Sequence, residues 1–171
     1  TEPISQELKG ALSETGVDVP LNTRYASDTE NFSPIYDRIQ SAGVDAAYVV
    51  MAHTGTAALV QWAKQQRPFG FGGIHVPMQL PSYYGSVNGA ARFAVTQNSA
   101  TPTSEITPKT VPYANAYQEA YGQFPVYTGY ITYDAVKQYA DAVQSAESRD
   151  PDDVVSALEQ STYTGTTGTI E

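Results

Sequence analysis

Segments typical of strands and helices alternate along the first half of this 171-residue chain. The run from Ala46 to Met51 (AAYVVM) is apolar without alternation, as expected for a parallel strand buried on both faces. Phe71 to Val76 is a second short strand, and Ala91 to Gln97 is a third. Because strands that alternate with helices need crossover connections, this pattern predicts an α/β fold with a mainly parallel sheet and flanking helices.

Helices are predicted where apolar residues recur at helical spacing between proline and glycine end signals. The predicted helices cover residues 3–15, 33–42, 54–66, 112–121, 133–146 and 151–160. Residues 17–26 alternate weakly around Pro20 and are predicted as an imperfect strand. The first helix has no strand before it, and the Thr/Gly tail ends where a further strand would begin. The sequence therefore predicts an incomplete α/β fold.

The charge of the chain limits its partners. Its net charge is −9, from 9 basic and 18 acidic residues. Phosphate binding needs a concentrated basic face, and the sequence shows none. Nucleic acid is therefore excluded as a partner, and an anionic membrane surface is disfavoured. The acidity fits a soluble protein kept monomeric by its charge, or alternatively an adaptation to high salt. No apolar stretch reaches the ~20 residues that span a bilayer.

The chain opens Thr1-Glu-Pro-Ile, without a Met or a basic signal region, so we expect a processed or truncated product.

The sequence contains no motif of an enzyme. A Gly-x-Ser-x-Gly elbow, a Walker loop and a dinucleotide fingerprint after a strand are all absent. The chain has no Cys, which excludes disulfides and thiolate metal sites. Its two histidines, His53 and His75, fall short of the three or four ligands that zinc requires. We therefore expect neither catalysis nor a metal or other cofactor.

Candidate binding residues follow the first two strands. In an open parallel sheet, ligands bind at the carboxyl ends of the strands, here residues 51–55 and 75–79. His53 is expected to line the site, whereas His75 is expected to lie beside the sheet. Thr54 starts a helix, where it is either a structural cap or part of a site for a carboxylate or another polar group.

Tyrosines form a second group of candidates. Tyr113, Tyr117 and Tyr121 repeat at steps of four, and such a stripe indicates core packing more often than a binding surface. Tyr130 stands beside Gly129 in the predicted connection before the Tyr133 helix. Because loops positioned by a scaffold commonly carry binding residues, Tyr130 is predicted to contact ligand.

Several short, loosely defined motifs follow one another along most of the chain. They are Asn31-Phe-Ser-Pro-Ile, Ala46–Met51, Ala63-Lys-Gln, Tyr117-x₃-Tyr121-Gly122, Tyr133-Asp-Ala-Val and Gly165-x-x-Gly168-x-Ile170. In this order and spacing the chain resembles type I solute-binding proteins of the branched-chain amino-acid class. The resemblance implies a type I periplasmic-binding-protein fold, in which two lobes close on a small molecule and deliver it to an ABC transporter permease.

The resemblance also implies how the chain divides. Residues 1–98 would form most of the second ligand-binding lobe, and residues 99–163 would contain a hinge crossing and helices that return to the first lobe. Residues 164–171 would cross back as a tail. The initial strands of the first lobe would be missing, so a missing first-lobe segment of the same parent is an expected partner. The expected location is extracytoplasmic, in the periplasm or at the cell surface.

Ligand contacts implied by the resemblance fall on Ala52 or His53, on Met78 and on Tyr130. Amino-acid-binding members carry a carboxylate at the second of these positions, where it receives the ligand's ammonium group. Here that position is Met78, with Gln79 beside it, and a thioether cannot pair with an ammonium. An amide, an organic acid, an aromatic compound or a peptide fragment therefore fits better. The alternative function is a ligand-sensing domain of a membrane receptor or regulator with the same fold.

Overall fold

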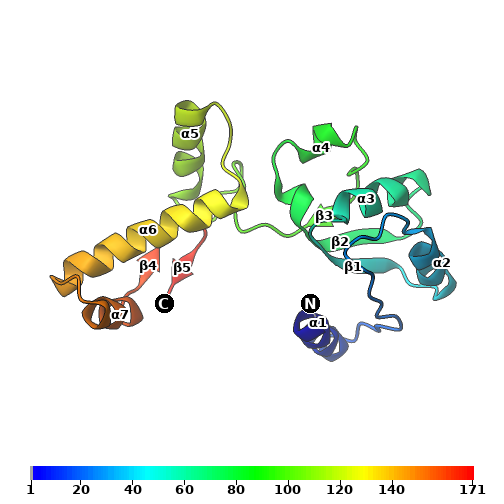
Figure 1. Cartoon of the computed structure of the whole chain (residues 1–171), viewed down its shortest axis with the longest axis horizontal. Coiled ribbons are helices and arrows are strands. Elements are labelled where there is room, and N and C mark those ends of the chain that lie inside the picture. The colour runs from blue at the N-terminus through cyan, green and yellow to red at the C-terminus, as the bar shows by residue number, and fades with distance from the viewer. Residues whose placement is uncertain (1) are drawn as a thin grey trace. The chain divides into compact units, whose positions relative to one another are not determined.

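The computed structural model describes residues 2–171 (Figure 1). The chain forms two compact units that meet in sequence between Gln97 and Asn98. The expected assignment of residues 1–98, 99–163 and 164–171 to the lobes, hinge and tail of a larger parent stays a prediction.

The first unit is built around a parallel sheet. Its elements are α1 (Glu2–Glu14), α2 (Ser33–Ser41), β1 (Ala46–Met51), α3 (Gly55–Lys64), β2 (Gly70–His75), the 3₁₀ turn η1 (Val76–Gln79), α4 (Tyr83–Ser86) and β3 (Val95–Thr96). The strand order is β1-β2-β3, and both strand pairs are parallel. The predicted α/β class with a parallel sheet and flanking helices is thus confirmed.

One face of this sheet is packed and the other is open. Val49 and Met51 are buried with Tyr36 of α2 and Trp62 of α3 in one hydrophobic core, whereas Tyr48 on the opposite face is 47% exposed. The expected burial of β1 on both faces is therefore wrong for the described residues. Its apolar sequence fits burial on two sides, but both helices contribute to the core on the same side.

Two predicted strands differ from the structure. Residues 17–26 form no strand, because Pro20 has no N–H for a ladder. In the segment Ala91–Gln97, only Val95 and Thr96 pair as β3. Turns replace the first part of that segment, since Arg92 N–H donates to the Gly89 carbonyl and Ala94 N–H to the Ala91 carbonyl.

The second unit consists of helices and a short hairpin. Its elements are α5 (Thr110–Tyr121), α6 (Tyr127–Ala146), α7 (Pro151–Glu159), β4 (Tyr163–Thr164) and β5 (Thr169–Ile170). α5 ends at Gly122, whose φ of 71° is left-handed, and the Asp150 carboxylate caps α7 by accepting from the Asp152 N–H at 3.0 Å. The antiparallel β4–β5 hairpin, which the sequence indicated only as a Thr/Gly tail, completes the unit.

α6 carries apolar residues on opposite sides. Tyr130 and Ala142 are buried on the side that packs within the unit. The predicted apolar stripe of Val136, Tyr139, Ala140 and Val143 lies on the other side, where Val136 is 61% and Tyr139 56% exposed. We call these four residues the outer stripe of α6. An apolar stripe on a helix normally packs against another element, whereas the described residues leave Val136 and Tyr139 of this stripe largely exposed.

Among the described residues, no helix is both long enough and apolar enough to cross a membrane.

Candidate functional site

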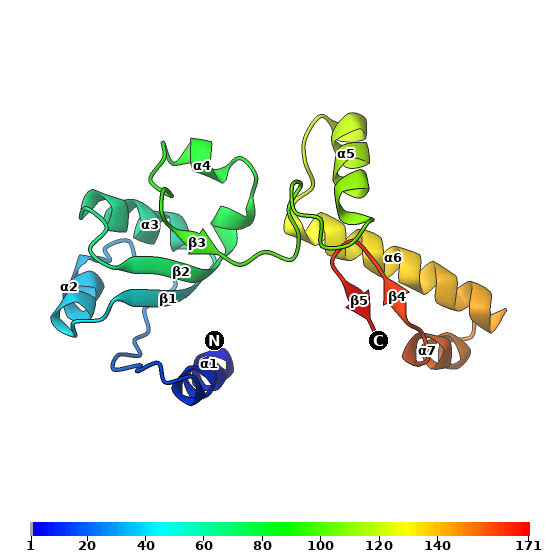
Figure 2. The same cartoon turned by 180° about the vertical axis from the view of Figure 1, so that it is seen from behind.

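The carboxyl ends of β1 and β2 bring two connecting segments together. The strands pair in parallel with Met51 opposite His75, so residues 52–54 and 76–79 leave the sheet at the same edge (Figure 2). Four of the five predicted binding residues lie there: His53, Thr54, Met78 and Gln79. The structure therefore supplies a surface formed by two short loops on a rigid sheet, the usual place for ligand binding in α/β proteins.

The first of these loops leads directly into α3. His53 is exposed, and Thr54 is the half-buried residue that immediately precedes the helix. The Thr54 side chain makes no capping hydrogen bond, although its carbonyl accepts from the Ala58 N–H at 3.1 Å. Its position as the N-cap is confirmed, but its hydroxyl is not used to cap the helix. The first turn of α3 thus presents backbone N–H groups suited to a carboxylate or another acceptor.

The second loop is the 3₁₀ turn η1, which holds Met78 and Gln79. Met78 is half-buried and packs against the core of the first unit. The Gln79 side-chain nitrogen donates to the Gln97 carbonyl at 3.0 Å, which ties η1 to the end of β3. This polar contact holds η1 in place. The side chain that η1 offers at Met78 is a thioether rather than a charged group.

His75 lies beneath both loops and is fully buried, in agreement with its expected place beside the sheet. Its Nδ1 accepts from the Met78 N–H at 3.2 Å. Burial lowers the pKa of His75, and this effect outweighs the opposing influence of the nearby Gly55 backbone. The imidazole is consequently neutral near pH 7.

Tyr130 does not lie in a connection, because α6 begins at Tyr127 and includes it. Its ring is fully buried with Ala100 and Ala114, and its hydroxyl has no hydrogen-bond partner among the described residues. The expected loop position is therefore wrong. Its role in ligand binding stays a prediction, and its ring lies in the second unit rather than with the other four residues.

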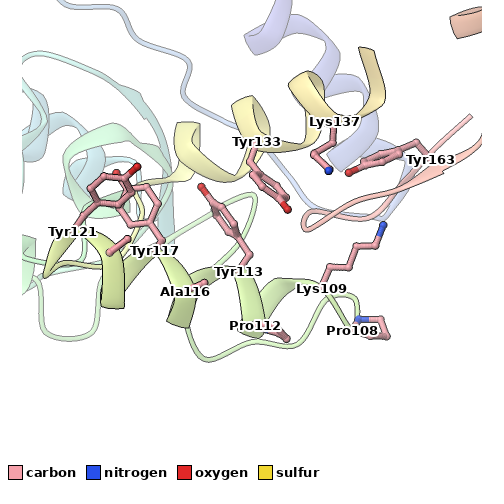
Figure 3. Close-up of a pocket in the computed structure, with 11 residues that line it drawn as sticks. Pro108, Lys109, Pro112, Tyr113, Ala116, Tyr117, Tyr121, Tyr133, Lys137 and Tyr163 are labelled. Atoms are coloured by element: carbon pink, nitrogen blue, oxygen red, sulfur yellow. The ribbon is translucent and has the colours of Figure 1, made fainter. Parts of the chain in front are cut away.

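A tyrosine-lined groove with a volume of about 680 Å³ lies in the second unit. Figure 3 shows Tyr113 of α5 facing Tyr133 of α6, with their ring centroids 4.5 Å apart, whereas Tyr117 and Tyr121 lie together farther along α5. The steps of four in Tyr113, Tyr117 and Tyr121 indicated this stripe as core, yet Tyr121 is 68% exposed. The stripe is thus only partly covered.

Across the described part of the chain, no group of three His, Cys, Asp or Glu side chains is placed to hold a metal ion.

Comparisons with protein families and with solved structures point to one kind of protein. The family described as "Periplasmic binding protein" matches residues 2–171. No match occurs among curated protein sequences. Among solved structures, a leucine-binding protein from Thermotoga maritima has a TM-score of 0.76 at 20% identity. A solute-binding protein of an ABC transporter from R. palustris in complex with benzoate has a TM-score of 0.79 at 12% identity, and another in complex with 4-hydroxybenzoate has 0.74 at 15%.

These structural matches cover nearly all of this chain but less than half of each solved chain. They cover 98%, 98% and 96% of this chain, but 48%, 47% and 46% of the respective solved chains. This chain therefore spans about half the length of the solute-binding proteins that it resembles.

Proposed function

Because the chain belongs to the periplasmic binding protein family, we propose that it is part of the extracytoplasmic solute-binding component of an ABC transporter. Such a protein binds a small molecule without changing it, and neither the family nor the structural neighbours are enzymes. The transporter permease is the partner that this function requires.

One observation carries the proposal: two loops meet at the carboxyl edge of a parallel sheet. The pairing of Met51 with His75 supports this site, because the segments with His53 and Thr54 and with Met78 and Gln79 leave the sheet at the same edge. A ligand at this edge would meet the exposed imidazole of His53, the free hydroxyl of Thr54 and the first N–H groups of α3. These are groups that orient a polar ligand without performing chemistry on it.

The same residues favour one class of ligand. Met78 offers an apolar, polarizable contact where an ammonium-binding member would need a carboxylate. The start of α3 favours a carboxylate or another acceptor. A small organic acid or amide with an apolar or aromatic body fits both. Solved relatives with benzoate and with 4-hydroxybenzoate bound are consistent with this class.

Capture by closure requires a second surface, which we assign to a first-lobe segment of a longer parent. The outer stripe of α6 and the Tyr48 face of the β1–β2–β3 sheet are apolar surfaces without a cover in the described residues. More than half of each solved relative lies outside the aligned part. In the parent, this segment would cover such surfaces and complete the binding site.

The test uses the full-length parent, titrated with leucine, benzoate and 4-hydroxybenzoate by calorimetry. If one of them binds, His53→Ala and Thr54→Val should each weaken binding by about tenfold or more, because each removes a polar ligand contact. Lys64→Ala, at the exposed far end of α3, is the control and should leave the affinity unchanged. Unchanged affinity in both site variants would rule out this edge as the site.

A further inference from the structure

The imidazole of His75 contacts both loops of the proposed site from inside the first unit. Its Nδ1 accepts from the Met78 N–H of η1 at 3.2 Å. On the other side, Gly55 of α3 approaches so closely that a Cβ added there would lie 2.7 Å from His75 Nε2. One ring therefore lies between the start of α3 and the turn that carries Met78.

The hydrogen bond to Met78 determines where the ring proton resides. A neutral imidazole has one donor nitrogen and one acceptor nitrogen, and Nδ1 is here the acceptor. The proton is then assigned to Nε2, which is buried and faces the backbone of Gly55, although no hydrogen bond of ordinary geometry forms there among the described residues. The Met78 N–H and the close approach of Gly55 therefore use opposite sides of the ring.

Aromatic and polar neighbours hold the ring in place. Its centroid lies 5.9 Å from that of Phe71 and 5.6 Å from that of Tyr83. The Tyr83 hydroxyl donates a hydrogen bond of 3.2 Å to Thr56 Oγ1 in the first turn of α3. The His75 backbone N–H donates to Thr96 Oγ1 of β3 at 3.2 Å. The ring thus packs between Phe71 and Tyr83, while Tyr83 is tied to α3 and the His75 backbone to β3.

We propose that His75 is a positioning residue, which through its Nδ1 acceptor holds the Met78 segment in register with the start of α3. It touches no ligand itself. This inference rests on the proposed function, because it assigns His75 the task of setting the spacing between the two ligand-binding loops. A phenylalanine would fill the ring volume without accepting from Met78, whereas an asparagine would keep an acceptor near the Nδ1 position and lose the ring.

Protonation would cancel this role, because a doubly protonated ring has no acceptor for the Met78 N–H. Of Gly55, Phe71, Met78 and Tyr83, which surround the ring, only Tyr83 titrates. Burial raises the pKa of Tyr83, so its side chain stays neutral and supplies no charge to stabilise an imidazolium. The positioning contact should therefore be lost as the pH falls.

The experiment measures amide hydrogen exchange at Met78 in the 171-residue chain, in wild type, His75→Asn and His75→Phe. The two variants separate the acceptor from the ring volume. We expect Met78 protection to fall by about tenfold in His75→Phe and to be largely retained in His75→Asn. The reverse order, with protection following ring volume, would overturn the proposal. Since a variant can fail to fold, nitrogen NMR of wild-type His75 is the second measurement, and a proton on Nδ1 would also overturn it.

Ligand binding is measured separately, so that the two proposals fail independently. In a parent that binds leucine, benzoate or 4-hydroxybenzoate, His75→Phe should weaken affinity by about tenfold and His75→Asn should largely restore it. Equal affinities for all three proteins would overturn the positioning role. If the parent binds none of these probes but Met78 protection follows the acceptor, the contact stands and the proposed ligand class falls.

Discussion

The carboxylate of Asp134 lies 2.8 Å from the backbone nitrogen of Thr166 and closes the turn between β4 and β5. It also accepts from the Thr166 hydroxyl at 2.9 Å and from Thr167 through its N–H at 3.1 Å and its hydroxyl at 3.0 Å. Asp134 is 2% exposed, so these donors replace its water. The Tyr-Asp-Ala-Val motif thus has a structural task in this chain, which is to fasten the hairpin to α6.

Replacing Asp134 with Asn should destabilise the second unit. The amide nitrogen cannot accept, so the Thr166 and Thr167 donors lose partners in a buried site, at a cost of about 2–3 kcal/mol. Amide exchange at these two residues should accelerate accordingly. Asp141→Asn, an exposed position on the same helix, is the matched control. If both substitutions have equal effects, the network does not hold the hairpin.

Gly165→Ala should be as damaging as the loss of the carboxylate. A Cβ at this position would come within 2.4 Å of the Asp134 carboxyl carbon, which is held by four donors and cannot move aside. Urea unfolding should show a loss of about 2 kcal/mol or more. Gly10→Ala in α1 meets nothing within 4 Å and should be neutral or stabilising by up to about 1 kcal/mol, since alanine favours helix.

Tyr130→Phe and Tyr36→Phe should differ in sign or size, although both remove one buried hydroxyl. Tyr36 donates to the Ala58 carbonyl at 2.6 Å, and its loss should cost about 1–2 kcal/mol. The Tyr130 hydroxyl has no partner among the described residues, so its removal should leave the unfolding free energy unchanged or raised. In the full-length parent, weaker ligand binding by a fully stable Tyr130→Phe variant would support the predicted ligand contact. A large loss of stability would contradict the unpaired hydroxyl.

Stability should fall on mild acidification. Burial lowers the folded-state pKa of His75, so the unfolded chain takes up a proton first, near its ordinary pKa of about 6.5. Above about pH 6.5, neutral His75 makes its full contribution to the free energy of unfolding. Between that pH and the lower folded-state pKa, this contribution falls by at most about 1.4 kcal/mol per pH unit. Chemical denaturation at about pH 7.5, 6.5 and 5.5 should show this slope. His75→Asn should remove the His75 part of it.

The outer stripe of α6 should tolerate polar residues in this chain but not in its parent. Val136 is 61% exposed here, so Val136→Gln should change the unfolding free energy by less than about 0.5 kcal/mol. In the full-length parent, where we propose that a first-lobe segment covers the stripe, the same change should cost about 1–3 kcal/mol. Comparable small effects in both proteins would contradict that assignment.

Much of the fold follows from local signals in the sequence. AAYVVM identifies β1 to the residue, and the proline and glycine signals place α2, α5 and α7 close to their true ends. These elements are predictable because their end signals act over a single turn. β3 and the β4–β5 hairpin are not predictable in the same way, since each pairs over only two residues and depends on contacts with distant segments.

The candidate site was predictable in position but not in detail. Topology alone places the segments after β1 and β2 at one edge, which locates His53 and Met78. No local pattern indicates that His75 Nδ1 accepts from Met78 or that Tyr130 points into the core, because burial is settled by tertiary packing. The outer stripe of α6 shows the converse limit: its apolar residues indicated a buried face, yet the cover is not among the described residues.

The fastening of the hairpin by Asp134 also has a consequence for the order of folding during synthesis. Asp134 precedes Thr166 by 32 residues. During synthesis, α6 therefore leaves the ribosome well before the N–H and hydroxyl groups that donate hydrogen bonds to its Asp134 carboxylate. Until the β4–β5 hairpin is synthesised, α6 and α7 can pack together only while the Asp134 carboxylate of α6 remains solvated. Nascent chains that stop before Thr166 would retain that solvated carboxylate, and we expect them to be more open to proteases than chains that include it.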